Sequence, residues 1–157
     1  MRRHLVVFIA SGAYLGYAPV VSGTFGTLAG VALYPLFDGL RSRSLPLYLL
    51  AFIALVAVAI WAAGEAEEFF GEKDSGKITI DEVAGYIAAT LFVPLTLGTV
   101  IASFLLFRLF DVVKPPPARA IDREMHGGAG VVLDDVFAGL YANLALRALW
   151  WLFQSRA

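Results

Sequence analysis

Six of the 13 Asp and Glu residues of this apolar chain lie at four places that we expect to converge, and these residues are the best placed to do chemistry. They are Asp81 with Glu82, Asp111, Asp122, and Asp134 with Asp135. Carboxylates that meet in a fold repel one another unless protons, cationic side chains or a metal ion compensate them. Clusters of oxygen ligands alone suit Mg²⁺, Mn²⁺ or Ca²⁺. The chain has no cysteine and only two histidines, His4 and His126, so a zinc site is not expected.

Two of these four places also have a purely structural explanation. The segment "TIDE" has the pattern of a capping box, in which Thr79 would cap a helix and Glu82 would bond back to the cap. Acids in the first turn of a helix also stabilise it through the helix dipole, by about 0.3–1 kcal/mol. We expect Asp134 and Asp135 to open the last helix, so the dipole would account for them too.

Asp111 has no such explanation, because we expect it near the end of a helix, where a negative charge is unfavourable. Arg108 precedes it by three residues and Lys114 follows it by three. These cations can neutralise Asp111, or they can face a substrate together with it. Arginine offers a forked set of donors to phosphate and lysine a point charge, so this segment is suited to binding phosphate.

A glycine-rich turn, "HGGAG" (126–130), lies between these cations and the last pair of acids. Its backbone N–H groups could approach an anion, although such a sequence is more commonly only a turn. His126 could act as a general acid, although a single loop histidine more commonly has a structural role. Carboxylates, cations and an apolar chain together indicate chemistry on a phosphorylated lipid.

Long stretches without charge indicate a membrane protein. The segments 5–37, 44–64 and 83–107 contain no Asp, Glu, Lys, Arg or His, and charged residues make up 16% of the chain. About 20 apolar residues of helix cross a membrane core of about 30 Å, and 44–64 fits this description. The alternative is a soluble helical bundle that buries its apolar faces in an oligomer. The net charge of −1 gives no indication of nucleic-acid binding.

The elements that must position the acids are expected to be helices over about 24–37, 46–70 and 134–153, with a turn at 38–46. The apolar stretch 83–107 has two readings. It is one membrane span, or a hairpin of helices over about 81–93 and 98–113 that turns at "PLTLG", because proline disfavours helix at and before its position.

The charges favour the hairpin, because it brings Asp81 and Asp111 to one end of the bundle with every acid except Asp38. More Lys and Arg residues lie in these loops than in the opposite turn, which carries Arg41 and Arg43. By the positive-inside rule, the end with the acids would be cytoplasmic. We therefore predict an all-α fold: a single domain over residues 1–157, a compact helical bundle that is membrane-embedded or membrane-associated, with a helical hairpin at 81–113 and a polar catalytic end.

The last helix and the start of the chain carry two further expectations. Asp135, Gly139, Asn143 and Arg147 recur every four residues, so they share a face that should look into the bundle. The apolar start of the chain has some features of a signal peptide, but its apolar run is short and interrupted by small residues, so we expect it to be retained.

Four blocks of sequence resemble the bacterial phosphatidylglycerophosphatase A family. They are "SGTFGTLAG" (22–30), "DEVAG" (81–85), "FRLFDVVKPPP" (107–117) and "DREMHGGAGVVLDDVFAG" (122–139). The resemblance covers roughly residues 20–145. It implies Mg²⁺-dependent hydrolysis of phosphatidylglycerophosphate to phosphatidylglycerol and phosphate, with the active site on the cytoplasmic face of the bacterial inner membrane. It implies no particular oligomeric state.

With this resemblance, we assign hypothetical roles to the site residues. The expected Mg²⁺ ligands are Asp81, Glu82, Asp134 and Asp135. The expected catalytic residues are Asp81, Asp111, Lys114, Asp134 and Asp135. The residues expected to bind substrate or phosphate are Gly23, Thr24, Arg108, Arg123, His126, Gly127 and Gly128.

The mechanism and the function both leave alternatives open. Attack by water is preferred over an aspartyl-phosphate intermediate, because the D-x-D-x-[TV] signature of phosphatases that use that route is missing. The alternative functions are a phosphatase for another lipid phosphate and a small ion-binding membrane transporter. A transporter would need acids in the middle of the membrane, whereas here they gather at one end.

Overall fold

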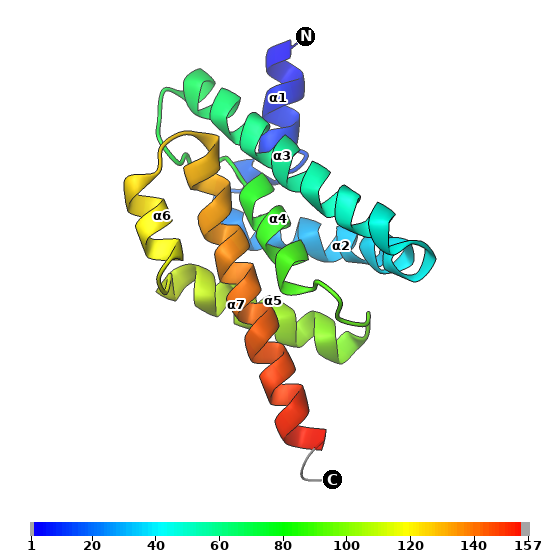
Figure 1. Ribbon diagram of the computed structural model, residues 1–157. Coiled ribbons are helices and arrows are strands. Elements are labelled where there is room, and N and C mark those ends of the chain that lie inside the picture. Colours follow the sequence, from blue (N-terminus) through cyan, green and yellow to red (C-terminus); the bar gives the residue numbers. More distant parts are fainter. Residues whose placement is uncertain (1, 155–157) are drawn as a thin grey trace.

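The computed structural model describes residues 2–154, and within them every regular element is a helix (Figure 1). The elements are α1 (Arg2–Ala10), the 3₁₀ turn η1 (Leu15–Tyr17), α2 (Ser22–Arg43), α3 (Leu45–Phe70), α4 (Ile80–Ala89), α5 (Leu97–Val113), α6 (Ala118–Glu124) and α7 (Gly128–Gln154). The predicted all-α fold is confirmed.

The short helix α4 is the centre of the fold. It packs against α7, α2 and α3 (Figure 1), and all of its residues are buried except Glu82, which is half-buried. A helix that is apolar on all sides is stable only inside a protein or a membrane. The longer helices therefore form a shell around α4, and the polar residues at its first turn are held inside that shell.

Glycines set the distance between α4 and α7. A Cβ atom on Gly139 would lie 2.0 Å from the carbonyl oxygen of Gly85, and one on Gly85 would lie 2.7 Å from the carbonyl oxygen of Asp135. Only glycine permits so close an approach of two backbones. Gly85 is one turn after Asp81, and Gly139 is one turn after Asp135. The contact therefore brings these two acids side by side.

The segment 83–107 is a hairpin and not a single span, as predicted, but its turn comes earlier. We expected the first helix to reach residue 93, whereas α4 ends at Ala89. The hydroxyl of Thr90 donates to the carbonyl oxygens of Tyr86 and Ile87. This local bonding competes with the continuing helix and moves the break four residues towards the N-terminus.

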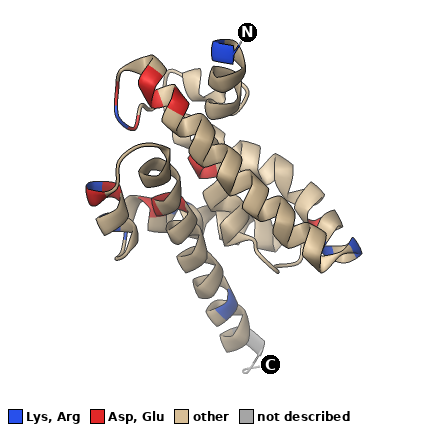
Figure 2. Cartoon of the chain, turned by 45° about the horizontal axis from the view of Figure 1, so that its top comes forward, with Lys and Arg blue, Asp and Glu red and all other residues tan. Residues whose placement is uncertain are grey.

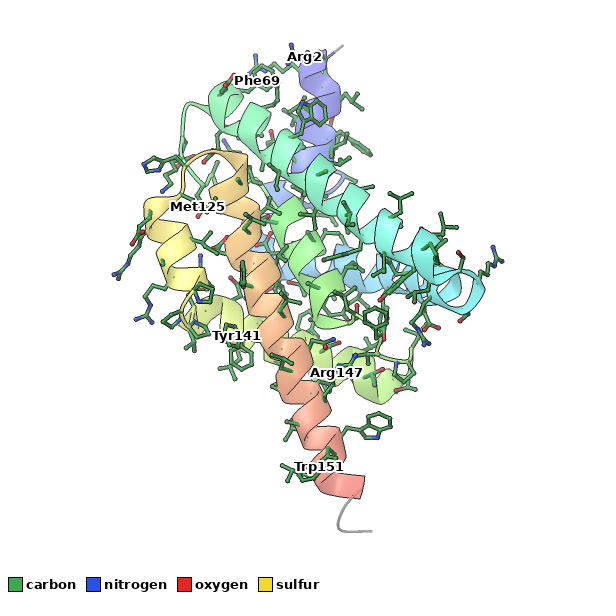
Figure 3. All side chains as sticks on the ribbon, viewed as in Figure 1. Arg2, Phe69, Met125, Tyr141, Arg147 and Trp151 are labelled. Atoms are coloured by element: carbon green, nitrogen blue, oxygen red, sulfur yellow. The ribbon has the colours of Figure 1, made fainter. Side chains whose placement is uncertain are left out.

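Side chains from three other helices satisfy the backbone of this turn. Asn143 Nδ2 donates to the carbonyl oxygens of Ala89 (2.9 Å) and Leu91 (2.8 Å), and Arg147 also donates to Leu91 (Figure 3). The hydroxyl of Tyr34 donates to the carbonyl oxygen of Val93, and the hydroxyl of Tyr48 accepts a bond from the N–H of Phe92. The polar stripe on α7 thus faces the bundle from Asp135 to Asn143, as expected, whereas Arg147 is exposed. Irregular backbone away from water requires such partners.

Two predicted boundaries are wrong. The expected turn at 38–46 is almost entirely helix: α2 continues to Arg43, α3 begins at Leu45, and Ser44 alone joins them while its hydroxyl accepts a bond from the N–H of Leu47. The last helix begins at Gly128, six residues before the expected start. Asp134 and Asp135 are therefore not in its first turn.

Two helices are long and apolar enough to cross a membrane, α3 and the part of α7 from Gly128 to Leu152. Only 17% of the most apolar stretch of α3 is buried, against 61% for α7. The side chains of α3 are therefore the more available to lipid, and this apolar surface indicates membrane association. Most Asp and Glu residues gather towards the end of the molecule where α3 ends (Figure 2). The far end of α2 carries the Asp38–Arg41 ion pair (2.8 Å).

We expect Gly139→Ala to destabilise the protein by about 1–3 kcal/mol, because the added methyl group would force α7 away from α4. The control is Gly39→Ala on α2, where a Cβ would meet nothing within 4 Å. This change should be neutral, or should stabilise the helix by about 0.5–1 kcal/mol. Denaturant unfolding of the purified protein in detergent measures both, and equal effects would contradict the close contact.

Candidate active site

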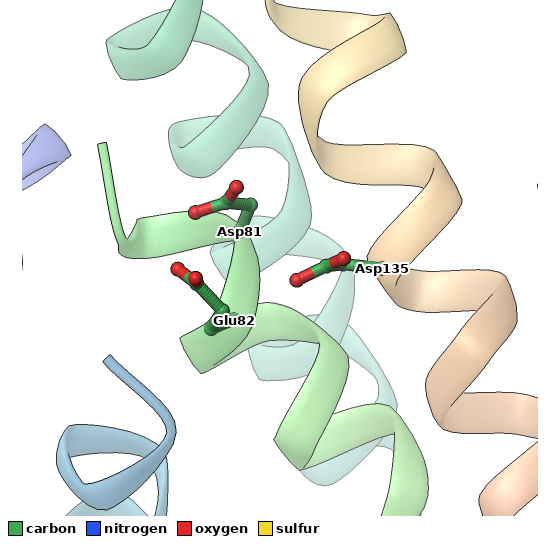
Figure 4. Close-up of side chains that lie close together, drawn as sticks. All are labelled: Asp81, Glu82 and Asp135. Carbon is green, nitrogen blue, oxygen red and sulfur yellow. The ribbon is translucent and has the colours of Figure 1, made fainter. Parts of the chain in front are cut away.

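Three carboxylates converge between α4 and α7 (Figure 4). Asp81 and Glu82 come from the first turn of α4, and Asp135 comes from the second turn of α7. Each offers one oxygen atom, and these atoms all lie within 4.8 Å of one another. Asp81 and Asp135 are only 8% and 4% exposed. Residues more than fifty positions apart in the sequence thus form one buried acidic cluster, which we call the carboxylate triad.

The carboxylate triad forms no ion pair in the described part of the chain, although the nearby charge of Arg108 opposes the effect of burial, which raises the pKa of Glu82. The atoms Asp81 Oδ1, Glu82 Oε2 and Asp135 Oδ2 are buried without a hydrogen bond, and none of the three residues forms an ion pair. Burial raises the pKa of Asp81 well above its usual value, and the adjacent charge of Glu82 raises it further. Burying uncompensated charge is costly. Three such oxygens at one point are a fitting ligand set for a hard divalent cation.

Arg108 borders the triad from α5. Its Nη1 atom lies 2.8 Å from Oδ2 of Asp111 but donates no hydrogen bond there, and it is buried. A Cβ atom on Gly23 would lie 2.3 Å from Oε1 of Glu82 and 3.1 Å from Nη1 of Arg108. The first turn of α2, the triad and Arg108 therefore meet at one end of the bundle. Residues near 81, 111 and 134 are brought together there, as the hairpin required.

Asp134 belongs to a different group from Asp135. Lys114 ends α5 with a positive φ of 45° and directs its Nζ atom to Asp134 Oδ2 (2.5 Å) and Asp122 Oδ1 (3.2 Å). Burial lowers the pKa of Lys114, but its bond to Asp134 and the nearby charges outweigh this effect, so the pKa is raised. Lys114 is therefore a protonated link between α5, α6 and α7. It neutralises Asp134 and leaves Asp135 unpaired.

The glycine-rich turn serves helix packing at one of its positions. A Cβ atom on Gly128 would lie 1.9 Å from the carbonyl oxygen of Ile60 on α3, so a side chain there is excluded by α3. Gly127 has a φ of 70°, which favours glycine. Arg123 and His126 are exposed, and no ion pair or side-chain hydrogen bond joins them to another described residue. Their predicted role in binding phosphate stays a prediction, as does that of the half-buried Thr24.

One structural explanation for the acids is wrong, and the other holds for one pair only, because Asp81 and Glu82 do lie in the first turn of α4. The hydroxyl of Thr79 makes no hydrogen bond, so no capping box forms at the start of α4. The first turn of α7 contains no acid, so the helix dipole does not account for Asp134 and Asp135. Sequence reasoning also missed that Gly26 borders the site. A Cβ atom on Gly26 would be 2.8 Å from Cβ of Thr79 and 3.0 Å from Oε2 of Glu82. The buried, unpartnered hydroxyl of Thr79 lies elsewhere, where a Cβ on Gly12 would be 2.9 Å from it.

Comparisons with known proteins agree on one family. The model of the family "Phosphatidylglycerophosphatase A" matches residues 8–150. A protein of Bacteroides thetaiotaomicron, named "Putative phosphatidylinositol-3-phosphatase", is 36% identical over 94% of both chains. Phosphatidylglycerophosphatase A of Escherichia coli is 32% identical over 84% of this chain and 76% of its own. The enzyme of the same name from Haemophilus influenzae is 32% identical over 92% and 88%. No solved structure matches.

We expect Lys114→Ala to destabilise the fold by about 1–3 kcal/mol, because it leaves the buried carboxylate of Asp134 without a partner. The matched control is Arg41→Ala, which breaks the more exposed ion pair to Asp38. Exposed pairs contribute about 1 kcal/mol or less. Denaturant unfolding of both variants checks the difference, and a Lys114→Ala protein as stable as the control would remove the proposed link between α5 and α7.

Proposed function

Because this chain belongs to the phosphatidylglycerophosphatase A family and is a lipid phosphatase, we propose that it hydrolyses phosphatidylglycerophosphate to phosphatidylglycerol and phosphate. We propose further that the reaction depends on Mg²⁺ and takes place at the cytoplasmic face of the bacterial inner membrane. One observation supports this proposal above the others. Three buried carboxylate oxygens without partners lie beside the buried Nη1 atom of the half-buried Arg108.

The carboxylate triad would hold the metal ion. Asp81, Glu82 and Asp135 offer only oxygen ligands, as Mg²⁺ prefers. When bound, Mg²⁺ would polarise the phosphoryl oxygens and favour ionisation of a water molecule. Asp134 was a candidate ligand on sequence grounds, but its ion pair with Lys114 makes it a supporting residue in this proposal.

The two cations near the triad, Arg108 and Lys114, would have different roles. Arg108 would bind the phosphate through its unused donors, and Asp111 would hold the guanidinium in place. Gly23 would leave room for the phosphate, because any side chain at that position would fill the space between Glu82 and Arg108. Lys114 is occupied by two carboxylates, so it would position α5 and would not contact substrate.

Hydrolysis would then proceed by attack of water on phosphorus. The water oxygen forms the new bond to phosphorus, and the bond between phosphorus and the terminal glycerol oxygen breaks. A carboxylate of the triad would accept one proton of the water and pass it to the departing glycerol oxygen, which leaves as the alcohol.

We expect Asp135→Asn and Asp81→Asn to lower kcat by at least about 100-fold, because each removes a charge that serves the transition state.

Exhaustive chelation should abolish phosphate release by the wild type, and Mg²⁺ should restore it. Mg²⁺ at 100 times its Kd should also raise the free energy of unfolding of the wild type by about 2.7 kcal/mol. The rise in Tm that reports this stabilisation should be absent in both variants. Asp38→Asn, at the far end of α2, is the control and should behave as wild type. Wild-type turnover after chelation would refute the metal requirement.

The substrate is tested by phosphate release from three lipids presented in the same micelles. We expect phosphatidylglycerophosphate to give the highest kcat/KM, above phosphatidic acid and phosphatidylinositol 3-phosphate. The last lipid is included because the relative that is 36% identical bears a phosphatidylinositol-3-phosphatase name. A preference for either of the other two would retain the lipid phosphatase and replace the proposed substrate.

A further inference from the structure

An apolar groove runs between α2 and α5 on the surface of the molecule. It has a volume of about 220 Å³ and is lined by Leu28, Val31, Val100, Ile101, Phe104 and Leu105. Three of these side chains, Leu28, Ile101 and Leu105, are between 47% and 62% exposed. Water is a poor solvent for such a surface, so the groove is suited to an apolar occupant.

The groove begins where the candidate active site ends. Leu28 is four residues after Thr24 on α2, and Phe104 is four residues before Arg108 on α5. One helical turn, about 5.4 Å, therefore separates the head of the groove from the point where Gly23, Glu82 and Arg108 meet. The cationic Arg108 marks this end, and carbon alone lines the rest.

We propose that the groove between α2 and α5 holds an acyl chain of the lipid substrate while its phosphate lies at Arg108 and the carboxylate triad. This inference rests on the proposed function, because a lipid phosphate joins a phosphate covalently to long apolar chains. When the terminal phosphate is bound, the headgroup and then the chains must leave the site over an adjacent surface. The groove supplies an apolar surface one helical turn away, and Arg108 at its head complements the negative charge.

A second apolar cavity, of about 490 Å³, lies between the start of α5 and the end of α7 and includes Leu146, Leu149 and Trp150. These residues follow Asp135 by 11 to 15 positions, roughly 17–22 Å along the helix axis. The groove residue farthest from Arg108 on α5, Val100, precedes it by eight positions, roughly 12 Å. Leu149, on α7, is therefore the control position, because it lies farther along its helix from the site.

The test measures kcat and KM of Leu28→Asn and Leu105→Asn on dioleoyl phosphatidylglycerophosphate in micelles, with Leu149→Asn in the second cavity as the control. We expect KM to rise at least tenfold in the two groove variants with kcat within twofold of wild type. The control should match the wild type. The deacylated headgroup, used as a competitive inhibitor, should keep its Ki in all variants, because it lacks the chains. A dioleoyl analogue with a diazirine in one chain should label peptides of α2 and α5.

The outcomes separate this inference from the proposed function. If the wild type releases no phosphate from the lipid, the proposed function fails. If the wild type is active but both groove variants keep its KM, the inference is overturned. The same holds if Leu149→Asn alone raises KM, if the label falls on α7, or if the Ki of the deacylated headgroup rises together with KM.

Discussion

The contact of Gly85 with Gly139 determines the geometry on which the candidate site depends. A Cβ on Gly139 would lie 2.0 Å from a backbone oxygen of α4, so the two helices approach as closely as backbones permit. Each glycine lies one turn after an acid, and the two acids therefore face each other across the contact. The price of this arrangement is electrostatic, because Asp81, Glu82 and Asp135 are held together where water is largely excluded.

The ion pairs around the triad relieve little of this cost. Lys114 pairs with Asp134 and Asp122, and Arg108 pairs with Asp111. These pairs fix the ends of α5, α6 and α7 around the triad while the triad itself stays unpaired. A fold selected for stability alone would pair buried carboxylates with cations. Among the described residues Arg108 lies near Glu82 but pairs with Asp111, and the triad itself forms no ion pair. This agrees with the proposed site, which keeps its ligands for an ion and a phosphate.

The hairpin of α4 and α5 connects the site to the apolar body of the protein. Its turn is irregular, yet Asn143, Tyr34 and Tyr48 from the bundle and the exposed Arg147 bond several of its backbone groups. Such bonding allows irregular backbone to lie at membrane depth. The opposite end of the hairpin carries the acids and Arg108. The hairpin thus has a polar end, which carries the candidate site, and an apolar end inside the bundle. This arrangement suits an enzyme whose proposed substrate has a polar headgroup and apolar chains.

The sequence by itself determined the all-α class, the hairpin and the set of candidate acids, because charge-free stretches, a proline break and carboxylates in apolar surroundings are local features. The order of the four motifs also identified the family. Only the tertiary structure decided which partner each acid meets. Asp134 and Asp135 are adjacent in the chain, but successive residues on a helix point about 100° apart, so one meets Lys114 and the other meets Asp81. That choice depends on where α7 begins and on how closely it packs against α4. Both depend on contacts of Gly128 and Gly139 with distant backbone, which no local pattern encodes.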